Sequence, residues 1–111
     1  KAFKISKRFD DDISSVCGSF NFKINNNKIK EAYIAYGGMA AVPKRAKACE
    51  EILKNKPLTI NTFNQAKNYL EKDLNPIGDM RASKEYRLEI AKNLLMKCFV
   101  EINSNQLTRV N

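Results

Sequence analysis

The sequence predicts an α+β fold in which a small antiparallel sheet has three helices packed on one face. Segments with strand-like alternation come first and segments with helical spacing follow, which favours segregated strands and helices over alternating βαβ units. A length of 111 residues, with 43% hydrophobic and 29% charged, suits one small domain that has its own core. We therefore expect residues 1–111 to form a single domain, with a frayed tail at 103–111.

Two strands are predicted between Val16 and Tyr36, joined as a β-hairpin. Apolar residues alternate with polar ones, which is typical of half-buried strands, apart from a gap at Gly18. Residues 25–28, Asn-Asn-Asn-Lys, tolerate left-handed backbone and predict the turn. An N-terminal strand precedes the hairpin. The apolar positions of the hairpin are Val16, Phe20, Phe22, Ile24, Ala32, Ile34 and Tyr36.

The first helix is predicted after the glycine pair Gly37-Gly38, which ends the second strand of the hairpin. Pro43 suits the first turn of a helix, because its missing N–H leaves no donor unpaired there. Asn55-Lys56-Pro57 closes the helix. Its apolar positions share one face and are Ala46, Cys49, Ile52 and Leu53. Cys49 is therefore expected in the core rather than as a reactive thiol.

Two more helices follow. The second is predicted from Thr59 or Asn61 to Asn75-Pro76, and the third begins with Ser83 as its N-cap. About 20 residues in the third helix would make a rod roughly 30 Å long, enough to cross the domain. The apolar positions at helical spacing are Phe63, Ala66, Leu70 and Leu74, then Tyr86, Ile90, Leu94, Cys98 and Ile102.

Composition excludes several classes of chemistry. The chain has no histidine, so Ser-His-Asp and Cys-His nucleophile systems and histidine metal sites are excluded within it. Three widely spaced cysteines predict neither a disulfide framework nor a zinc or iron–sulfur site, and they favour a reduced, cytoplasmic setting. No secretory signal or membrane-spanning run is visible. Because the chain opens on Lys1, we expect a piece of a longer polypeptide.

A net charge of +8 raises the possibility of a nucleic-acid-binding module. The cations are scattered from Lys1 to Arg109, however, and no RNP-like aromatic set or Gly-x-x-Gly clamp accompanies them. Nucleic-acid binding is therefore kept only as a less favoured alternative, and we expect neither a nucleic acid nor a membrane as partner.

The most informative local feature is a reversal of charge near the N-terminus. Four cations, Lys1, Lys4, Lys7 and Arg8, are followed by three adjacent carboxylates at residues 10–12. Adjacent like charges repel unless the two halves meet each other, a ligand or a partner. Either a solvated turn or a functional loop explains this pattern when it is taken alone.

Two other segments contain more than a packing pattern. Residues 35–46 place paired glycines just before a helix N-terminus, where backbone can approach a neighbour closely. Residues 77–87 bring polar residues to the start of the long helix, where Asp79 could pair with Arg81 or Arg87. A plain strand-to-helix turn and a capped helix entry are the alternatives.

Taken together, FKISKRFDDDIS, AYGGMAAVPKRA and DMRASKEYR resemble the C-terminal domain of the FAD-binding subunit of molybdenum hydroxylases, most of all xanthine dehydrogenases. The resemblance runs from about Lys1 to about Ile102. It implies the α+β sandwich of that domain, in agreement with the hairpin and helices predicted above.

The resemblance also implies a function in electron transfer. In such enzymes a molybdenum–pterin (molybdopterin) centre hydroxylates a purine or related heterocycle, as in purine catabolism, and electrons pass through [2Fe–2S] clusters to FAD and then to NAD or oxygen. The implied partners are an upstream FAD-binding domain and the iron–sulfur and molybdenum–pterin subunits. We do not expect the isolated 111 residues to be active. A structural assembly role in the same complex is the alternative.

By the same resemblance, Lys4 matches a lysine that contacts FAD, and a cation suits the pyrimidine end of a flavin, where negative charge builds on reduction. Asp11 and Asp12 match, with Asp10, a mobile acidic loop that would tune the flavin electrostatically. Phe9 stands where relatives carry a second arginine. No catalytic residue and no metal ligand is implied in this chain. Close packing and loop anchoring explain Gly37, Gly38 and Arg81.

Overall fold

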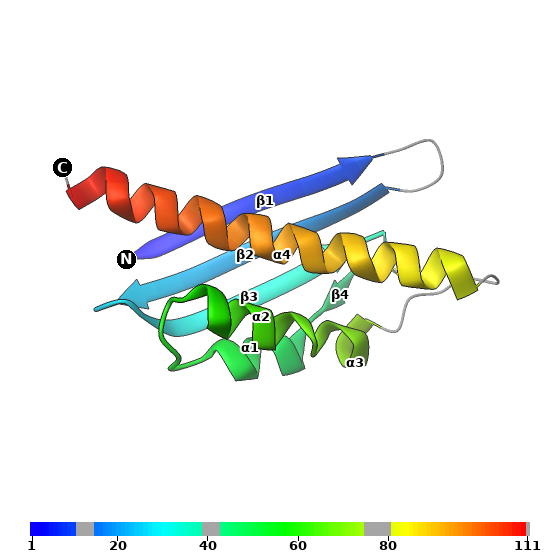
Figure 1. The fold of residues 1–111 in the computed structure, drawn as a ribbon, viewed down its shortest axis with the longest axis horizontal. Helices are drawn as coiled ribbons and strands as arrows, with labels where there is room; N and C mark the ends of the chain where they lie inside the picture. Colours follow the sequence, from blue (N-terminus) through cyan, green and yellow to red (C-terminus); the bar gives the residue numbers. More distant parts are fainter. Residues whose placement is uncertain (11–14, 39–42, 75–80, 111) are drawn as a thin grey trace.

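The computed structural model describes residues 1–10, 15–38, 43–74 and 81–110. For residues 81–83 and 105–110 it describes the backbone alone. The described strands are β1 (Ala2–Asp10), β2 (Ser15–Asn25), β3 (Lys28–Gly37) and β4 (Lys44–Arg45). The described helices are α1 (Lys47–Leu53), α2 (Ile60–Lys67), α3 (Leu70–Leu74) and α4 (Arg81–Val110). The strands form one antiparallel sheet in the order β1-β2-β3-β4, and the long α4 crosses it (Figure 1). The predicted α+β class is confirmed.

The β2–β3 hairpin forms as predicted from its alternation and its asparagine turn. Phe20 pairs with Ile34 across the two strands, and Phe22 pairs with Ala32. Asn26 and Asn27 have φ angles of 53° and 59°, the left-handed backbone for which asparagine is suited. The register shifts between Lys23 and Ile24, which is a β-bulge in the strand.

One face of the sheet carries the core. Residues of β2 alternate strictly between exposed and buried from Ser15 to Asn25, and the buried set faces the helices. Gly18 occupies the gap in this apolar series because the Phe20 ring covers it: a Cβ there would lie 2.7 Å from that ring. The fully buried, large side chains are Tyr36, Phe20, Phe22, Phe63, Ile29, Ile34, Leu53, Leu70, Leu74, Leu95 and Ile102.

The entry to α1 differs from the prediction. Pro43 is not in the first turn of a helix, because Lys44–Arg45 forms the short strand β4 and the helix begins at Lys47. Arg45 pairs with Ala35 of β3, and the Ala46 N–H donates to the Ile34 carbonyl at 2.8 Å. The backbone of Arg45 and Ala46 therefore pairs with β3 and does not form the first turn of the helix.

The second predicted helix is divided in two. Near the end of α2, the Asn68 N–H donates to the Gln65 carbonyl at 3.3 Å, and the Tyr69 N–H donates to the Ala66 carbonyl at 3.0 Å. These bonds span three residues instead of four, so they tighten the chain and separate α2 from α3. The predicted apolar face is still buried in both pieces.

The long helix α4 is confirmed and extends beyond its prediction. It begins at Arg81, so Ser83 lies inside the helix and is not its cap, and it ends at Val110. The apolar positions Ile90, Leu94, Cys98 and Ile102 are buried as predicted, whereas Tyr86 is 43% exposed. The fraying expected for residues 103–111 stays a prediction. Among the described residues, no helix has the length and apolar character needed to span a membrane.

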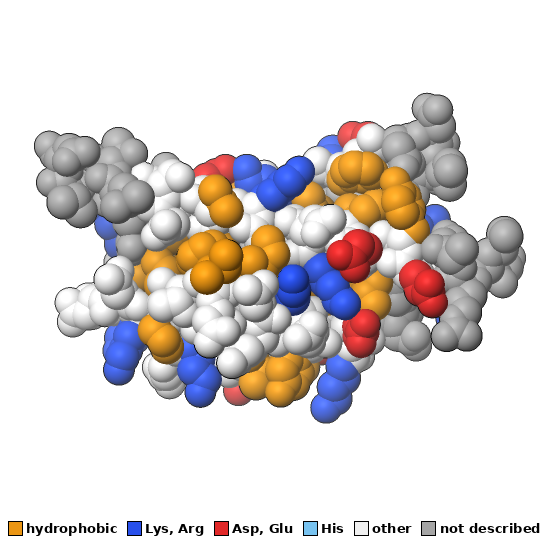
Figure 2. Space-filling model, viewed as in Figure 1, with side chains coloured by type: hydrophobic (Ala, Val, Ile, Leu, Met, Phe, Trp, Pro, Cys, Tyr) orange, Lys and Arg blue, Asp and Glu red, His pale blue; other side chains and the backbone are white. Residues whose placement is uncertain are grey.

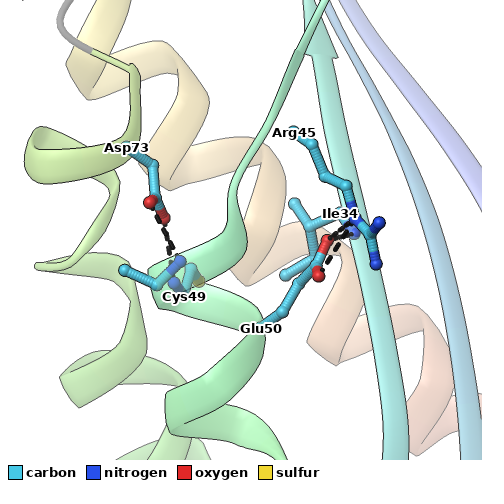
Figure 3. A network of polar contacts seen from close by, with 6 residues as sticks. Ile34, Arg45, Cys49, Glu50 and Asp73 are labelled. Carbon is cyan, nitrogen blue, oxygen red and sulfur yellow. Dashed lines mark hydrogen bonds and ion pairs between the residues drawn. The ribbon is translucent and has the colours of Figure 1, made fainter.

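Two carboxylates fix α1 between the sheet and α3 (Figure 3). The two oxygens of Asp73 accept hydrogen bonds from the Ala48 and Cys49 N–H groups, each at 2.9 Å. Glu50 points the other way and accepts from the Ile34 N–H of β3 at 2.8 Å. Both carboxylates pair with backbone donors that would otherwise be unsatisfied, so α1 holds a defined position beside β3 and β4.

Candidate functional site

Ion pairs account for part of the charge reversal near the N-terminus. The Arg8 guanidinium meets Asp10 at 2.7 Å, which raises the pKa of Arg8, and the Ser15 hydroxyl also donates to Asp10 at 2.6 Å. Lys7 points to the opposite face of β1, where it pairs with Glu101 of α4. These contacts explain Lys7 and Arg8 without a ligand. Asp11 and Asp12 lie outside the described residues.

Lys4 has a different environment from Lys7 and Arg8. It lies opposite Asn21 on the face of the sheet away from the helices, where its side chain is exposed. In the part of the chain that the structure describes, it forms no ion pair and no side-chain hydrogen bond. Lys4 thus differs from Lys7 and Arg8, whose ion-pair partners are among the described residues.

Lys4 lines a hollow of about 310 Å³ on this open face. The lining residues come from all four strands and are Ala2, Lys4, Asn21, Phe22, Lys23, Glu31, Ala32, Tyr33 and Arg45. The bulge between Lys23 and Ile24 lies in the same part of the sheet, where it interrupts the regular pairing. Bulges are common beside functional sites because they locally bend a strand. We call this the Lys4 hollow.

Tyr33 and Arg45 form the side of the Lys4 hollow opposite β1. The Arg45 guanidinium carbon lies 4.3 Å from the centroid of the Tyr33 ring, a cation–π contact. The Arg45 Nε also bonds Glu50 at 2.9 Å, and this hydrogen bond raises the pKa of Arg45. At the rim, Lys23 pairs with Glu31 at 3.0 Å. The hollow therefore combines cations, an aromatic face and a neutral amide from Asn21.

The sequence analysis named Lys4 as a candidate but not Tyr33 or Arg45, which line the same hollow. Tyr33 carries a signal: it is a large aromatic residue in the exposed phase of a strand whose other phase holds Ala32, Ile34 and Tyr36. Arg45 has no such signal in the sequence, because it reaches the sheet only through the short strand β4, where it pairs with Ala35.

The glycine pair has a packing role, as predicted. Gly38 has a φ of 85°, and a Cβ at this position would lie 2.0 Å from the Ser15 carbonyl oxygen. At Gly37, a Cβ would lie 2.9 Å from the Cys17 sulfur. The end of β3 thus approaches the start of β2 too closely for a side chain. The predicted pairing of Asp79 lies outside the described residues.

The buried thiols belong to the core. Burial raises the pKa of both the Cys49 and the Cys98 thiol well above the ordinary value, so each is protonated and unreactive near neutral pH. The core assignment of Cys49 is confirmed. Among the described residues, no cluster of three or more metal-ligating side chains is found.

The chemistry of the Lys4 hollow is suited to binding rather than to catalysis. Ammonium and guanidinium groups beside an aromatic ring fit an electron-rich planar group such as the pyrimidine end of a flavin. Its volume of about 310 Å³ is at the lower end for ligand pockets, so it would take part of a large cofactor. A larger hollow of about 530 Å³ is lined by Ile52, Lys56, Gln65, Asn68 and Tyr69, and Lys4 is not among its lining residues.

The helix-covered side of the molecule looks different from this site. Figure 2, in the same view as Figure 1 with α4 in front of the sheet, shows apolar side chains in several separate groups among charged and polar ones. The exposed apolar residues include Tyr86 and Val100 of α4. Tyr86 meets the Phe9 ring edge-on, with 6.4 Å between the ring centroids.

The domain is an antiparallel sheet with helices on one face and a cationic hollow on the other. The chain belongs to the family of CO dehydrogenase flavoprotein C-terminal domains, whose model matches residues 1–102. It is 29% identical over 99 residues to a xanthine dehydrogenase FAD-binding subunit from Escherichia coli O157:H7, covering 89% of this chain and 34% of that protein. A glyceraldehyde dehydrogenase medium chain from Sulfolobus acidocaldarius is 34% identical over 80 residues, covering 72% of this chain and 28% of that protein.

The fold is also found in a solved structure. A carbon monoxide dehydrogenase from Hydrogenophaga pseudoflava, described as lacking the Mo-pyranopterin moiety of its molybdenum cofactor, superposes with a TM-score of 0.75 at 16% identity. The match covers 86% of this chain and 34% of that one. The chain thus spans about a third of the length of the relatives that it matches.

Proposed function

We propose that this chain is the C-terminal part of the FAD-binding subunit of a xanthine dehydrogenase-like molybdenum hydroxylase. Membership of the flavoprotein family and likeness to an FAD-binding subunit support this proposal. The observation that carries it is the position of Lys4, which lies in a cationic hollow on the open sheet face without a partner among the described residues. In this proposal the domain covers one side of the flavin.

Lys4 has the role of a cofactor contact. Its ammonium group donates to the electron-rich edge of the flavin, and it favours the reduced state because negative charge is greater there. The flavin, when bound, supplies the electron-transfer chemistry that no side chain of this domain provides. Lys7 pairs with Glu101 and Arg8 with Asp10, whereas Lys4 lines the hollow and Lys1 does not, so Lys4 is the cation of this segment proposed to contact the cofactor.

Asp11 and Asp12 have the role of electrostatic tuning. Carboxylates near the flavin oppose the negative charge that Lys4 stabilises, so they influence whether electrons go to NAD or to oxygen. In this proposal an upstream FAD-binding domain and the iron–sulfur and molybdenum–pterin subunits complete the cytoplasmic enzyme. Electrons reach the flavin from [2Fe–2S] clusters in that assembly.

The test replaces Lys4 by Ala in the complete enzyme and measures FAD dissociation and NAD-dependent turnover. We expect FAD to bind about tenfold more weakly, the effect of losing one charge-assisted hydrogen bond. Lys44→Ala is the matched control, because Lys44 is an exposed lysine that does not line the Lys4 hollow. Asp11→Ala is expected to change the ratio of NAD reduction to oxygen reduction while FAD stays bound.

A structural assembly role predicts the opposite pattern. If Lys4→Ala and Asp11→Ala both retain normal FAD binding and normal turnover, the domain serves to hold subunits together and the proposed flavin contact is wrong.

A further inference from the structure

The Lys4 hollow contains a second cation that neither the sequence nor the comparisons assign. We propose that Arg45 is a further flavin-binding residue opposite Lys4, with Tyr33 and Glu50 as the residues that position its guanidinium. This inference rests on the proposed function, since it takes the group bound at Lys4 to be the flavin. It adds a contact from β4, the short strand that the sequence did not predict.

Glu50 fixes one edge of the Arg45 guanidinium. The Glu50 carboxylate is buried, with 7% of the residue exposed, and it accepts from the Ile34 N–H at 2.8 Å. Its two oxygens meet the Arg45 Nε at 2.9 and 3.1 Å. The ion pair uses the Nε edge, and the terminal nitrogens lie on the side away from the carboxylate (Figure 3). Glu50 therefore holds Arg45 in place through Nε, and the terminal N–H donors of Arg45 face away from the Glu50 carboxylate.

Tyr33 fixes the plane of the guanidinium. The Arg45 guanidinium carbon lies 4.3 Å from the ring centroid, and the Tyr33 side chain comes from the neighbouring strand β3. Arg45 remains 45% exposed at its side chain despite both contacts, and it lines the Lys4 hollow. An arginine held in this way loses little conformational freedom when it binds a planar partner.

The two cations enclose the hollow from different strands. Lys4 lies on β1, Asn21 beside it on β2, Tyr33 on β3 and Arg45 on β4. At the rim of the hollow, the charges of Lys23 and Glu31 cancel, because the two side chains form an ion pair. Lys4 and Arg45 thus line the hollow from the two edge strands, and each carries N–H donors that suit the electron-rich edge of a flavin ring.

A purely structural role for Arg45 is the competing explanation, since Arg45 also neutralises Glu50. The double variant Arg45→Gln, Glu50→Gln separates the two roles in the complete FAD-binding subunit. It removes both charges of the pair together, so no carboxylate is left buried without its partner, and a glutamine at position 50 still accepts from the Ile34 N–H. The matched control is Lys44→Gln on the same short strand.

The measurements are the FAD dissociation constant, the two-electron midpoint potential of the bound flavin and the unfolding midpoint of the FAD-free protein. We expect the double variant and Lys4→Gln each to raise the dissociation constant about tenfold. We also expect each cation to favour the reduced flavin over the oxidised flavin about tenfold. Its loss should therefore lower the two-electron midpoint potential by about 30 mV in each variant. Lys44→Gln is expected to leave FAD affinity and potential unchanged.

Three results overturn the inference. If the double variant binds FAD like the Lys44→Gln control while Lys4→Gln binds it weakly, Arg45 is structural and the proposed function stands. If the double variant and Lys4→Gln both match the control, the flavin role of Lys4 falls as well. If the double variant loses affinity and Lys4→Gln does not, the two cations do not share one ligand.

A second variant covers the case in which the double variant does not fold. Arg45→Lys keeps a positive charge beside Glu50 but loses the planar group that stacks on Tyr33. We expect about threefold weaker FAD binding with an unchanged unfolding midpoint. Unchanged FAD affinity in Arg45→Lys overturns the inference.

Discussion

The two faces of the sheet are built from the same strands but serve different purposes. On β2, Val16, Phe20 and Phe22 are at most 1% exposed beneath the helices, whereas Cys17, Ser19 and Asn21 of the other phase are exposed. The covered face places apolar side chains where they leave water, and this burial drives folding. The open face contributes little burial, so its residues are available for binding.

Aromatic contacts are also distributed differently between the two faces. On the covered face the Phe20 ring packs against both the Phe22 ring and the Tyr36 ring, with centroids 6.5 and 5.7 Å apart. The open face has its single cation–π contact among the described residues between Arg45 and Tyr33. Changes in the core, in pH and on the open face test this division.

The largest effect is expected from Phe20→Ala on the covered face. Phe20 is 1% exposed and contacts Tyr36 and Phe22, so truncation leaves a cavity in the centre of the core. We expect a loss of about 3–5 kcal/mol in the free energy of unfolding, measured by urea denaturation. Ser19→Ala, next in the chain on the open face, is the control and is expected to stay within about 0.5 kcal/mol. Equal losses would refute the division between the faces.

An intermediate effect is expected from alkaline pH, through the buried thiols. Cys49 and Cys98 have raised pKa values in the folded chain, while an unfolded cysteine loses its proton near the ordinary value of 9.0. Above that pH the unfolded state binds fewer protons than the folded state, so stability falls as pH rises.

We expect each thiol to contribute a decline of up to about 1.4 kcal/mol per pH unit above pH 9, and no such decline below it. Burial also raises the pKa of Tyr36, which adds to the decline above pH 10. Urea denaturation from pH 7 to pH 10.5 measures the slope, and Cys49→Ala should reduce it. A slope that Cys49→Ala and Cys98→Ala leave unchanged would contradict this explanation.

The smallest effect is expected from the open-face ion pair of Lys23 with Glu31. Its nitrogen and oxygen are 3.0 Å apart, but the two side chains are 66% and 62% exposed. The double variant Lys23→Gln, Glu31→Gln should change the free energy of unfolding by less than about 0.5 kcal/mol, because exposed pairs are screened by water. A double-mutant cycle with both single variants measures the coupling. A coupling above about 1 kcal/mol would show that the open face does contribute to stability.

Much of the fold could be predicted from local pattern. The alternation of β2, the asparagine turn and the apolar spacing of α4 each act within one segment, and all three are confirmed. The predictions that failed depend on pairing between segments. Pro43 was assigned to a helix because nothing local shows that Arg45 would pair with Ala35 of β3.

The site was predicted less completely than the fold. Lys4 came from a family resemblance, and the structure places it on the open face, in a hollow. The roles of Asp11 and Asp12 stay predictions. Tyr33 and Arg45 could not be found beside Lys4, because 29 and 41 residues separate them from it along the chain.

Local sequence pattern was enough for the class of fold, for most residues of the core and for the absence of histidine chemistry. Those properties follow from composition and from the periods of strand and helix, which any local segment expresses. The ion pair of Lys7 with Glu101 and the hollow that Lys4 shares with Tyr33 and Arg45 arise from the packing of distant segments. Such contacts depend on strand order and register, which long-range burial selects and which no single segment contains.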